Sequence, residues 1–207
     1  MVGGGVLLLF RISSRVMTAE IREIPFDAQT AQVVFRVQWF GVIPVTGRFT
    51  ALQGQLSMPR DGLDGATISV DVDAASVDSG IALRDRHLRG PRFLDSARYP
   101  FISFRSTRIR PNDGTIHVEG VLSVRGVEQT VAFHCVVNGP AGNGNGDTLS
   151  LHATMRVSRT RFGVGRPRGI LTYSPLFSAI ADVVRVDARV SVPAIRALPA
   201  LLPALGR

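Results

Sequence analysis

The sequence contains no lysine, and all 24 of its basic residues are arginines, which give a formal net charge of +8. Arginine stays charged in proteins and binds phosphate or carboxylate with two parallel hydrogen bonds, so anionic partners are favoured. Cys135 is the single cysteine, which excludes an intramolecular disulfide and a zinc site built on several thiolates. Its position in an apolar alternation predicts a small buried side chain. No apolar run approaches the roughly 20 residues that a membrane-spanning helix needs.

Charged residues make up only 19% of the chain and hydrophobic residues 45%, which excludes a chain disordered by composition. In residues 1–20, Arg11 and Arg15 follow a short apolar run, whereas a secretory signal carries its positive charge first. We therefore expect residues 1–20 to be an N-terminal extension, with Met17 as an alternative start. A cytoplasmic location is expected, with a periplasmic or secreted location as the alternative. Residues 193–207 form a proline-punctuated apolar tail, which favours a homodimer if it is exposed.

Residues 21–192 show an alternation of apolar and polar residues, which is typical of strands with one apolar face. About eight such strands are joined by turns rich in glycine, asparagine, aspartate and proline. A sandwich or a barrel would satisfy this pattern, and the simple succession favours an all-β, eight-stranded antiparallel up-and-down barrel, which is lipocalin-like. A short helix is expected within residues 79–90, before Gly90 and Pro91. The predicted apolar faces include Val33, Phe35, Val37 and Trp39; Ile68, Val70 and Val72; Ile102 and Phe104; Ile116, Val118, Leu122 and Val124; Val131, Phe133, Cys135 and Val137; Leu149, Leu151, Ala153, Met155 and Val157; Val184, Val186, Ala188, Val190 and Val192.

A polar cluster, Arg84-Asp85-Arg86-His87, lies in the expected helix. His87 as a general base oriented by Asp85 is disfavoured, because residues i and i+2 of a helix do not face each other and no nucleophile motif accompanies them. We expect a hydrogen-bonded lattice that fixes the helix and the following loop to the end of the barrel, with anion contact as the second interpretation. We expect no catalytic residue, and also no metal site, because the other three histidines lie on different strands without metal-binding spacing.

Residues 156–168 contain five arginines around a glycine-rich centre that lacks the P-loop pattern. Two interpretations remain open, a solvated basic loop and a basic rim that meets a phosphate headgroup or an anionic membrane surface. Nucleic-acid binding is disfavoured, because the chain has one tryptophan, two tyrosines and no stacking series on a basic strand face.

Several segments, in order, make the sequence resemble the YceI family of lipocalin-like, polyisoprenoid-binding proteins. They are VTGRF with GQLSM, VDVDAASVDSG, RDRHLRGPRFLDSARYPFISFRST, VEGVLSVRGVEQTVAF and SRTRFGV. Arg92 and Arg161 stand where the family commonly has acidic residues, and both add positive charge. The resemblance implies an eight-stranded antiparallel barrel whose hydrophobic tunnel holds a long isoprenoid chain, such as a polyprenyl phosphate or a quinone tail.

From the resemblance and the alternation we expect a non-enzymatic protein that binds, sequesters or transports a long-chain isoprenoid lipid, without a cofactor. Two alternatives stay open, an enzyme acting on a lipid or small electrophile in the same cavity and a stress-linked interaction module without ligand. The candidate ligand-binding residues of the cavity or its mouth are Phe35, Trp39, Phe49, Arg84, His87, Phe93, Phe104, Phe133, Met155, Arg159 and Phe162.

Overall fold

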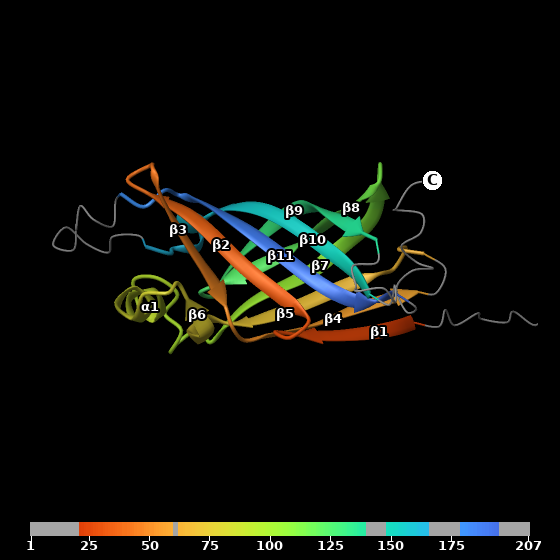
Figure 1. Cartoon of the computed structure of the whole chain (residues 1–207), viewed down its shortest axis with the longest axis horizontal. Helices are drawn as coiled ribbons and strands as arrows, with labels where there is room; N and C mark the ends of the chain where they lie inside the picture. The colour runs from red at the N-terminus through yellow and green to blue at the C-terminus, as the bar shows by residue number, and fades with distance from the viewer. Residues whose placement is uncertain (1–20, 60–61, 140–147, 166–178, 195–207) are drawn as a thin grey trace, which may run out of the picture.

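The computed structural model describes residues 21–59, 62–139, 148–165 and 179–194. These residues form one antiparallel sheet that curls into an elongated barrel (Figure 1). Its strands are β1 (Ile21–Asp27), β2 (Ala31–Trp39), β3 (Ile43–Phe49), β4 (Leu52–Pro59), β5 (Thr67–Asp73), β6 (Val77–Asp78), β7 (Phe101–Asn112), β8 (Thr115–Val124), β9 (Val127–Asn138), β10 (Thr148–Ser158) and β11 (Val183–Pro193).

The all-β antiparallel architecture is confirmed, but the sheet has eleven strands and not the eight predicted. The difference arises because three long runs are interrupted: residues 28–30 separate β1 from β2, residues 50–51 separate β3 from β4, and the 3-10 helix η1 (Ala74–Ser76) separates β5 from β6. The interruptions do not change which runs are neighbours. The run that contains β1 and β2 pairs with the run that contains β3 and β4, because β1 pairs with β4 and β2 pairs with β3. The last strand, β11, pairs with β2, so the sheet curls back to the first run.

One end of the barrel, beyond the cavity described below, is filled by side chains. Met58, Leu149 and Val192 have no exposed surface, and Ile24 and Leu56 are also buried beside them in the core. These residues come from β1, β4, β10 and β11, so strands far apart in the sequence contribute to one packed layer. We call this the packed end, and it lies on the right in Figure 1.

The helix α1 (Ala82–Arg89) lies at the opposite end of the barrel (Figure 1). Its position confirms the helix that the sequence predicts, and the helix ends at Gly90, whose N–H is bonded to the carbonyl of His87. The 3-10 helix η2 (Arg159–Phe162), which ends at Gly163 in the left-handed conformation, follows β10 at the same end. No helix in the described part of the chain is long and apolar enough to span a bilayer.

Candidate functional site

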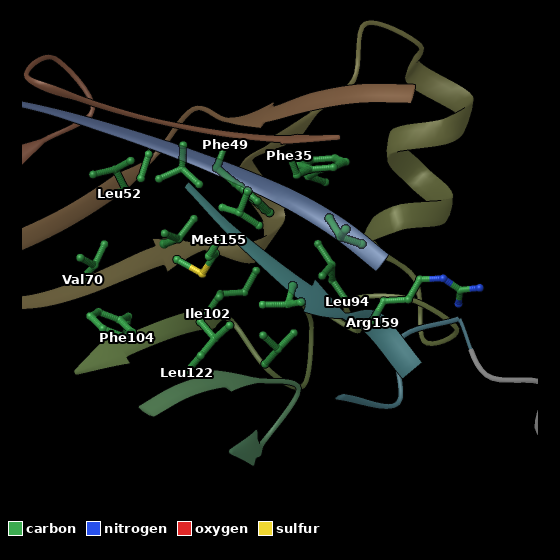
Figure 2. Close-up of a pocket in the computed structure, with 18 of the residues that line it drawn as sticks. Phe35, Phe49, Leu52, Val70, Leu94, Ile102, Phe104, Leu122, Met155 and Arg159 are labelled. Carbon is green, nitrogen blue, oxygen red and sulfur yellow. The ribbon is translucent and has the colours of Figure 1, made fainter. Parts of the chain in front are cut away.

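A cavity of about 620 Å³ extends into the barrel from the end at which α1 lies (Figure 2). This volume falls within the range of about 300–1,000 Å³ that is usual for small-molecule sites. Side chains from strands on all sides point into it, including Ile102, Phe104, Leu122 and Met155 in Figure 2. The wall is almost wholly apolar, and the described lining residues include no aspartate or glutamate.

Most of the apolar strand faces predicted from the alternation line this cavity. Val33, Phe35, Val37 and Trp39 of β2 all line it, as do Val184, Val186, Ala188 and Val190 of β11. Ile116, Val137, Leu149 and Val192 belong instead to the packed core. The alternation therefore identifies the inner face of each strand, and the position along the barrel axis decides whether that face lines a cavity or a filled core.

Glycines beside two phenylalanines keep aromatic rings against the wall. Phe35 of β2 pairs directly with Gly47 of β3, and a Cβ atom at Gly47 would overlap the Phe35 ring. Likewise, a Cβ atom at Gly120 of β8 would overlap the ring of Phe104. Because the glycines leave this room, both rings lie flat on the neighbouring strand and do not fill the lumen.

Three small side chains widen the cavity where β9, β10 and β11 lie side by side. Ala153 pairs with Cys135 on one side and with Ala188 on the other, and all three residues line the cavity. Cys135 is buried, as the sequence predicts, and burial raises the pKa of its thiol to about 11. A thiol with this pKa is protonated at neutral pH and acts as a small apolar group.

The mouth of the cavity is marked by residues that line it and are also exposed to solvent. Ile81, before α1, and Leu83, within it, are 53% and 59% exposed. The polar lining groups Arg84 and His87 lie on the same helix. The cavity therefore opens beside α1, which contributes two of its polar lining residues, while Arg189 lines it from within β11.

Two residues of the polar cluster of α1, Arg84 and Asp85, form part of the predicted lattice, and they bind the segment before the helix. Asp85 is buried and accepts hydrogen bonds from the backbone N–H and the hydroxyl of Ser79. Arg84 donates to the Ser79 hydroxyl and carbonyl at 2.7 and 2.6 Å, and Arg89 donates to the carbonyls of Ala75 and Val77. These bonds fix α1 to the segment that follows β5. The His87 side chain forms no hydrogen bond or ion pair with another described residue.

Arg159 lines the cavity through its stem, while its guanidinium points away from the apolar side chains (Figure 2). The guanidinium donates to the carbonyls of Ala181, Val164 and Ile180 at 2.7–3.0 Å. Burial lowers the pKa of Arg159 from its usual value, and the charge of Asp182 counteracts the effect. Arg159 therefore ties the segment after η2 to the segment before β11 at the rim.

Arg125 has the same role on the other side of the rim, and the sequence reasoning missed it. This arginine is 7% exposed and occupies the turn between β8 and β9, with a positive φ of 54°. It donates to the carbonyls of Pro91, Arg92 and Gly163, and its guanidinium lies 3.8 Å from Asp95. An arginine followed by glycine predicts a tight turn, but no local pattern indicates that its side chain folds back into the barrel end.

All eleven candidate residues line the cavity, although they come from eight different strands, helices and loops. Phe93 and Phe162 lie at the rim, next to the carbonyls that Arg125 and Arg159 hold. Contact of these residues with a ligand stays a prediction. Within the run of arginines, Arg166 and Arg168 lie outside the described residues.

The remaining histidines lie on the outer face of the barrel. The rings of His117 and His134 are 5.0 Å apart across β8 and β9, and His117 lies 3.2 Å from a Glu119 carboxylate oxygen. His152 lies 3.8 Å from Asp187, which also accepts hydrogen bonds from Arg36 and Thr154. The described residues contain no group of three or more side chains suited to hold a metal ion.

The segment from β1 to β11 matches a known protein family: a family model described as a YceI-like domain covers residues 25–192. The chain belongs to the YceI-like family. A relative from Pseudomonas putida, called a UPF0312 protein, is 31% identical over 157 residues, which are 75% of this chain and 81% of the relative. A UPF0312 protein of Vibrio cholerae is 28% identical over 159 residues, or 70% of this chain and 84% of the relative.

Solved structures share the fold of this YceI-like domain. BcnA of Burkholderia cenocepacia superimposes with a TM-score of 0.66 at 23% identity, over 80% of this chain and 98% of its own. A polyisoprenoid binding domain from Saccharophagus degradans, implicated in plant cell wall breakdown, gives a TM-score of 0.62 at 17% identity, over 84% of this chain and 99% of its own. At these identities the likeness shows the fold, and the YceI-like fold and the resemblance expected from the sequence are confirmed.

Proposed function

We propose that this YceI-like protein binds a long-chain isoprenoid lipid in its cavity and sequesters or transports it. The observation that carries the proposal is an apolar cavity of about 620 Å³ that opens to solvent at one end and is closed by packed side chains at the other. The neighbour from Saccharophagus degradans, described as a polyisoprenoid binding domain, has the same fold.

Burial of the chain supplies the driving force in this proposal. Each five-carbon prenyl unit removed from water contributes on the order of 2–4 kcal/mol before the costs of association and ordering are subtracted. The widened stretch at Cys135, Ala153 and Ala188 leaves room for branched methyl groups, and the flat rings of Phe35 and Phe104 provide apolar walls.

The headgroup in this proposal stays at the mouth. Arg84 and His87 are the polar side chains of α1 that line the cavity, and the described lining residues carry no acidic group. This charge pattern favours an anionic or hydrogen-bond-accepting headgroup, which a polyprenyl phosphate or the carbonyl oxygens of a quinone would provide.

A binding role is favoured over catalysis by the chemistry of the wall. A nucleophile is activated by an adjacent base or by a lowered pKa. The thiol of Cys135 lines the cavity, but burial raises its pKa to about 11, and its hydrogen bonds involve backbone groups of Val136 and His152.

Native mass spectrometry of the full chain purified from its own host tests the proposal. We expect a co-purified lipid with a mass series spaced by isoprene units. Ala153→Trp, which places an indole in the lumen, should abolish the adduct, whereas Val136→Trp places the same group on the exposed outer face of β9 and should keep it. A wild-type protein that is consistently free of lipid and does not take up added polyprenyl phosphate would count against the proposal.

A further inference from the structure

Exposed apolar side chains gather at the mouth end of the barrel. Ile81 and Leu83 belong to the α1 side of the mouth, Phe40 and Val42 belong to the turn between β2 and β3, and Ile43 begins β3. These five are between 47% and 76% exposed. The turn is continuous with the cavity wall, because Trp39 and Val45, which flank it, line the cavity. Both segments lie at the same end in Figure 1. We call these five residues the mouth patch.

The charges beside the mouth patch are predominantly positive. Arg86 of α1 and Arg161 of η2 are exposed, and neither guanidinium is bonded to another described residue. The acidic groups at this end already have partners within the protein: Asp85 is buried against Ser79, and Asp78 pairs with Arg48. Hydrogen bonds from the Ser158 hydroxyl and from Thr160 lower the pKa of Asp182 to about 2.

We propose that the mouth patch, with Arg86 and Arg161, docks on the surface of an anionic lipid bilayer, so that the cavity opens directly onto the membrane. The apolar side chains enter the boundary between headgroups and acyl chains, and the two arginines contact anionic headgroups. A water-soluble partner protein would also cover apolar side chains, but two features favour a lipid surface: the mouth patch is continuous with an apolar cavity, and Arg86 and Arg161 are exposed cations without an ion-pair partner among the described residues.

Exposed apolar residues away from the mouth provide a comparison for the mouth patch. Ile21 on β1 and Val136 on β9 are exposed apolar residues in strands that run to the packed end. They stand singly, and the cavity does not reach them. Single exposed apolar residues are ordinary on soluble proteins, so these two positions serve as controls for the mouth patch.

The biological purpose of docking rests on the proposed lipid-binding function, but docking is measured separately. Co-sedimentation of the full chain with vesicles of phosphatidylcholine and phosphatidylglycerol is the assay, with pure phosphatidylcholine vesicles for comparison. We expect binding to the anionic vesicles that weakens as salt is raised. Val42→Glu/Leu83→Glu should weaken it at least about tenfold, because two apolar groups are lost from the interface.

Ile21→Glu/Val136→Glu adds the same two negative charges away from the mouth and should weaken binding far less. Arg86→Gln should reduce binding about fivefold, whereas Arg108→Gln, which removes an exposed arginine from the wall strand β7, should change it less than about twofold. Circular dichroism establishes that each variant is folded.

Equal losses for the mouth and control variants would overturn the proposal, because they would indicate attraction by net charge alone. Absence of wild-type binding to anionic vesicles would overturn it as well. A dimer in buffer that Val42→Glu/Leu83→Glu abolishes would assign the mouth patch to a second copy of the chain and also overturn it. Ala153→Trp, which fills the lumen, should keep vesicle binding, so docking and lipid uptake can fail independently.

Discussion

The two ends of the barrel are built from the same strands but differ in what fills them. At the packed end Met58, Leu149 and Val192 belong to one core and have no exposed surface. At the mouth end Phe35 and Met155 face a cavity of about 620 Å³. Burial at the packed end therefore stabilises the fold, while the apolar wall at the mouth end stays available to a ligand. Under the proposed function, stability and binding are thus assigned to different halves of one barrel.

The two ends also differ in how their polar groups are used. At the mouth end, Arg125 and Arg159 are buried and bind backbone carbonyls of the segments that surround the opening. Such bonds provide donors to carbonyl groups that lie outside the sheet ladder. The arginine side chains therefore help to hold the opening in shape, together with buried apolar residues such as Phe93 and Phe162.

The largest expected effect is the difference in stability between two variants that each truncate one methionine, Met58 at the packed end and Met155 at the mouth end. Met58→Ala should reduce the free energy of unfolding by about 2–5 kcal/mol, because it creates a void in a packed core. Met155→Ala should cost about 1 kcal/mol or less, since its side chain already faces the cavity. Urea unfolding of both variants measures the difference. Equal losses would mean that the two ends are packed alike.

The next largest effect concerns the arginines of the rim. Arg125→Met should cost about 2–3 kcal/mol, because it leaves the carbonyls of Pro91 and Gly163 without their donor. Hydrogen exchange should become faster in residues 91–95 and 163–165 and stay unchanged in β1 and β4. Arg108→Met removes an exposed arginine and should stay within about 0.5 kcal/mol. Faster exchange throughout the sheet would contradict a role confined to the rim.

Alanine substitutions of Gly47 and Gly120 distinguish an effect on the shape of the cavity from an effect on stability. Gly120→Ala should cost about 1–3 kcal/mol, because its Cβ would lie 2.5 Å from the carbonyl oxygen of Arg105, which cannot move away. Gly47→Ala meets only the Phe35 ring, which can swing into the lumen, so its cost should stay below about 1 kcal/mol. Lipid uptake should nevertheless fall for Gly47→Ala. Full uptake by a folded Gly47→Ala protein would show that the Phe35 ring does not control the lumen.

The smallest effect is a pH dependence at the mouth end. The folded pKa of Asp182, about 2, lies below the unfolded value of about 3.9, so the carboxylate stabilises the fold above pH 4. This contribution is lost as the pH falls through 2. Because Asp182 is exposed, solvent screening keeps it below about 1 kcal/mol. Urea unfolding at pH 5 and pH 2 should show a smaller loss in Asp182→Asn than in the wild type.

Much of the candidate site was predictable, and particular residues show why. Phe35, Phe133 and Met155 were assigned to the cavity from alternation, because successive side chains of a strand point to opposite faces. The tie between α1 and the barrel was also expected from the polar cluster around Asp85. Arg125 was missed, because its partners are 33 to 38 residues away in the sequence. The strand count was wrong, because short interruptions such as η1 divide long runs without breaking their pairing.

Some expectations stay predictions. The homodimer was based on the tail at residues 193–207, most of which lies outside the described residues, as do residues 1–20. The cytoplasmic location and the lipid itself also stay predictions.

The sequence by itself determined which side chains face the interior, because alternation is a local property of an extended backbone. Only the tertiary structure decided where that interior is empty. Whether a lumen is filled depends on which side chains meet across it, and Met58 meets Leu149 and Val192 only after the sheet has curled. The position of the mouth follows in the same way, since α1 and the arginine-held segments come together at one end only in the folded chain.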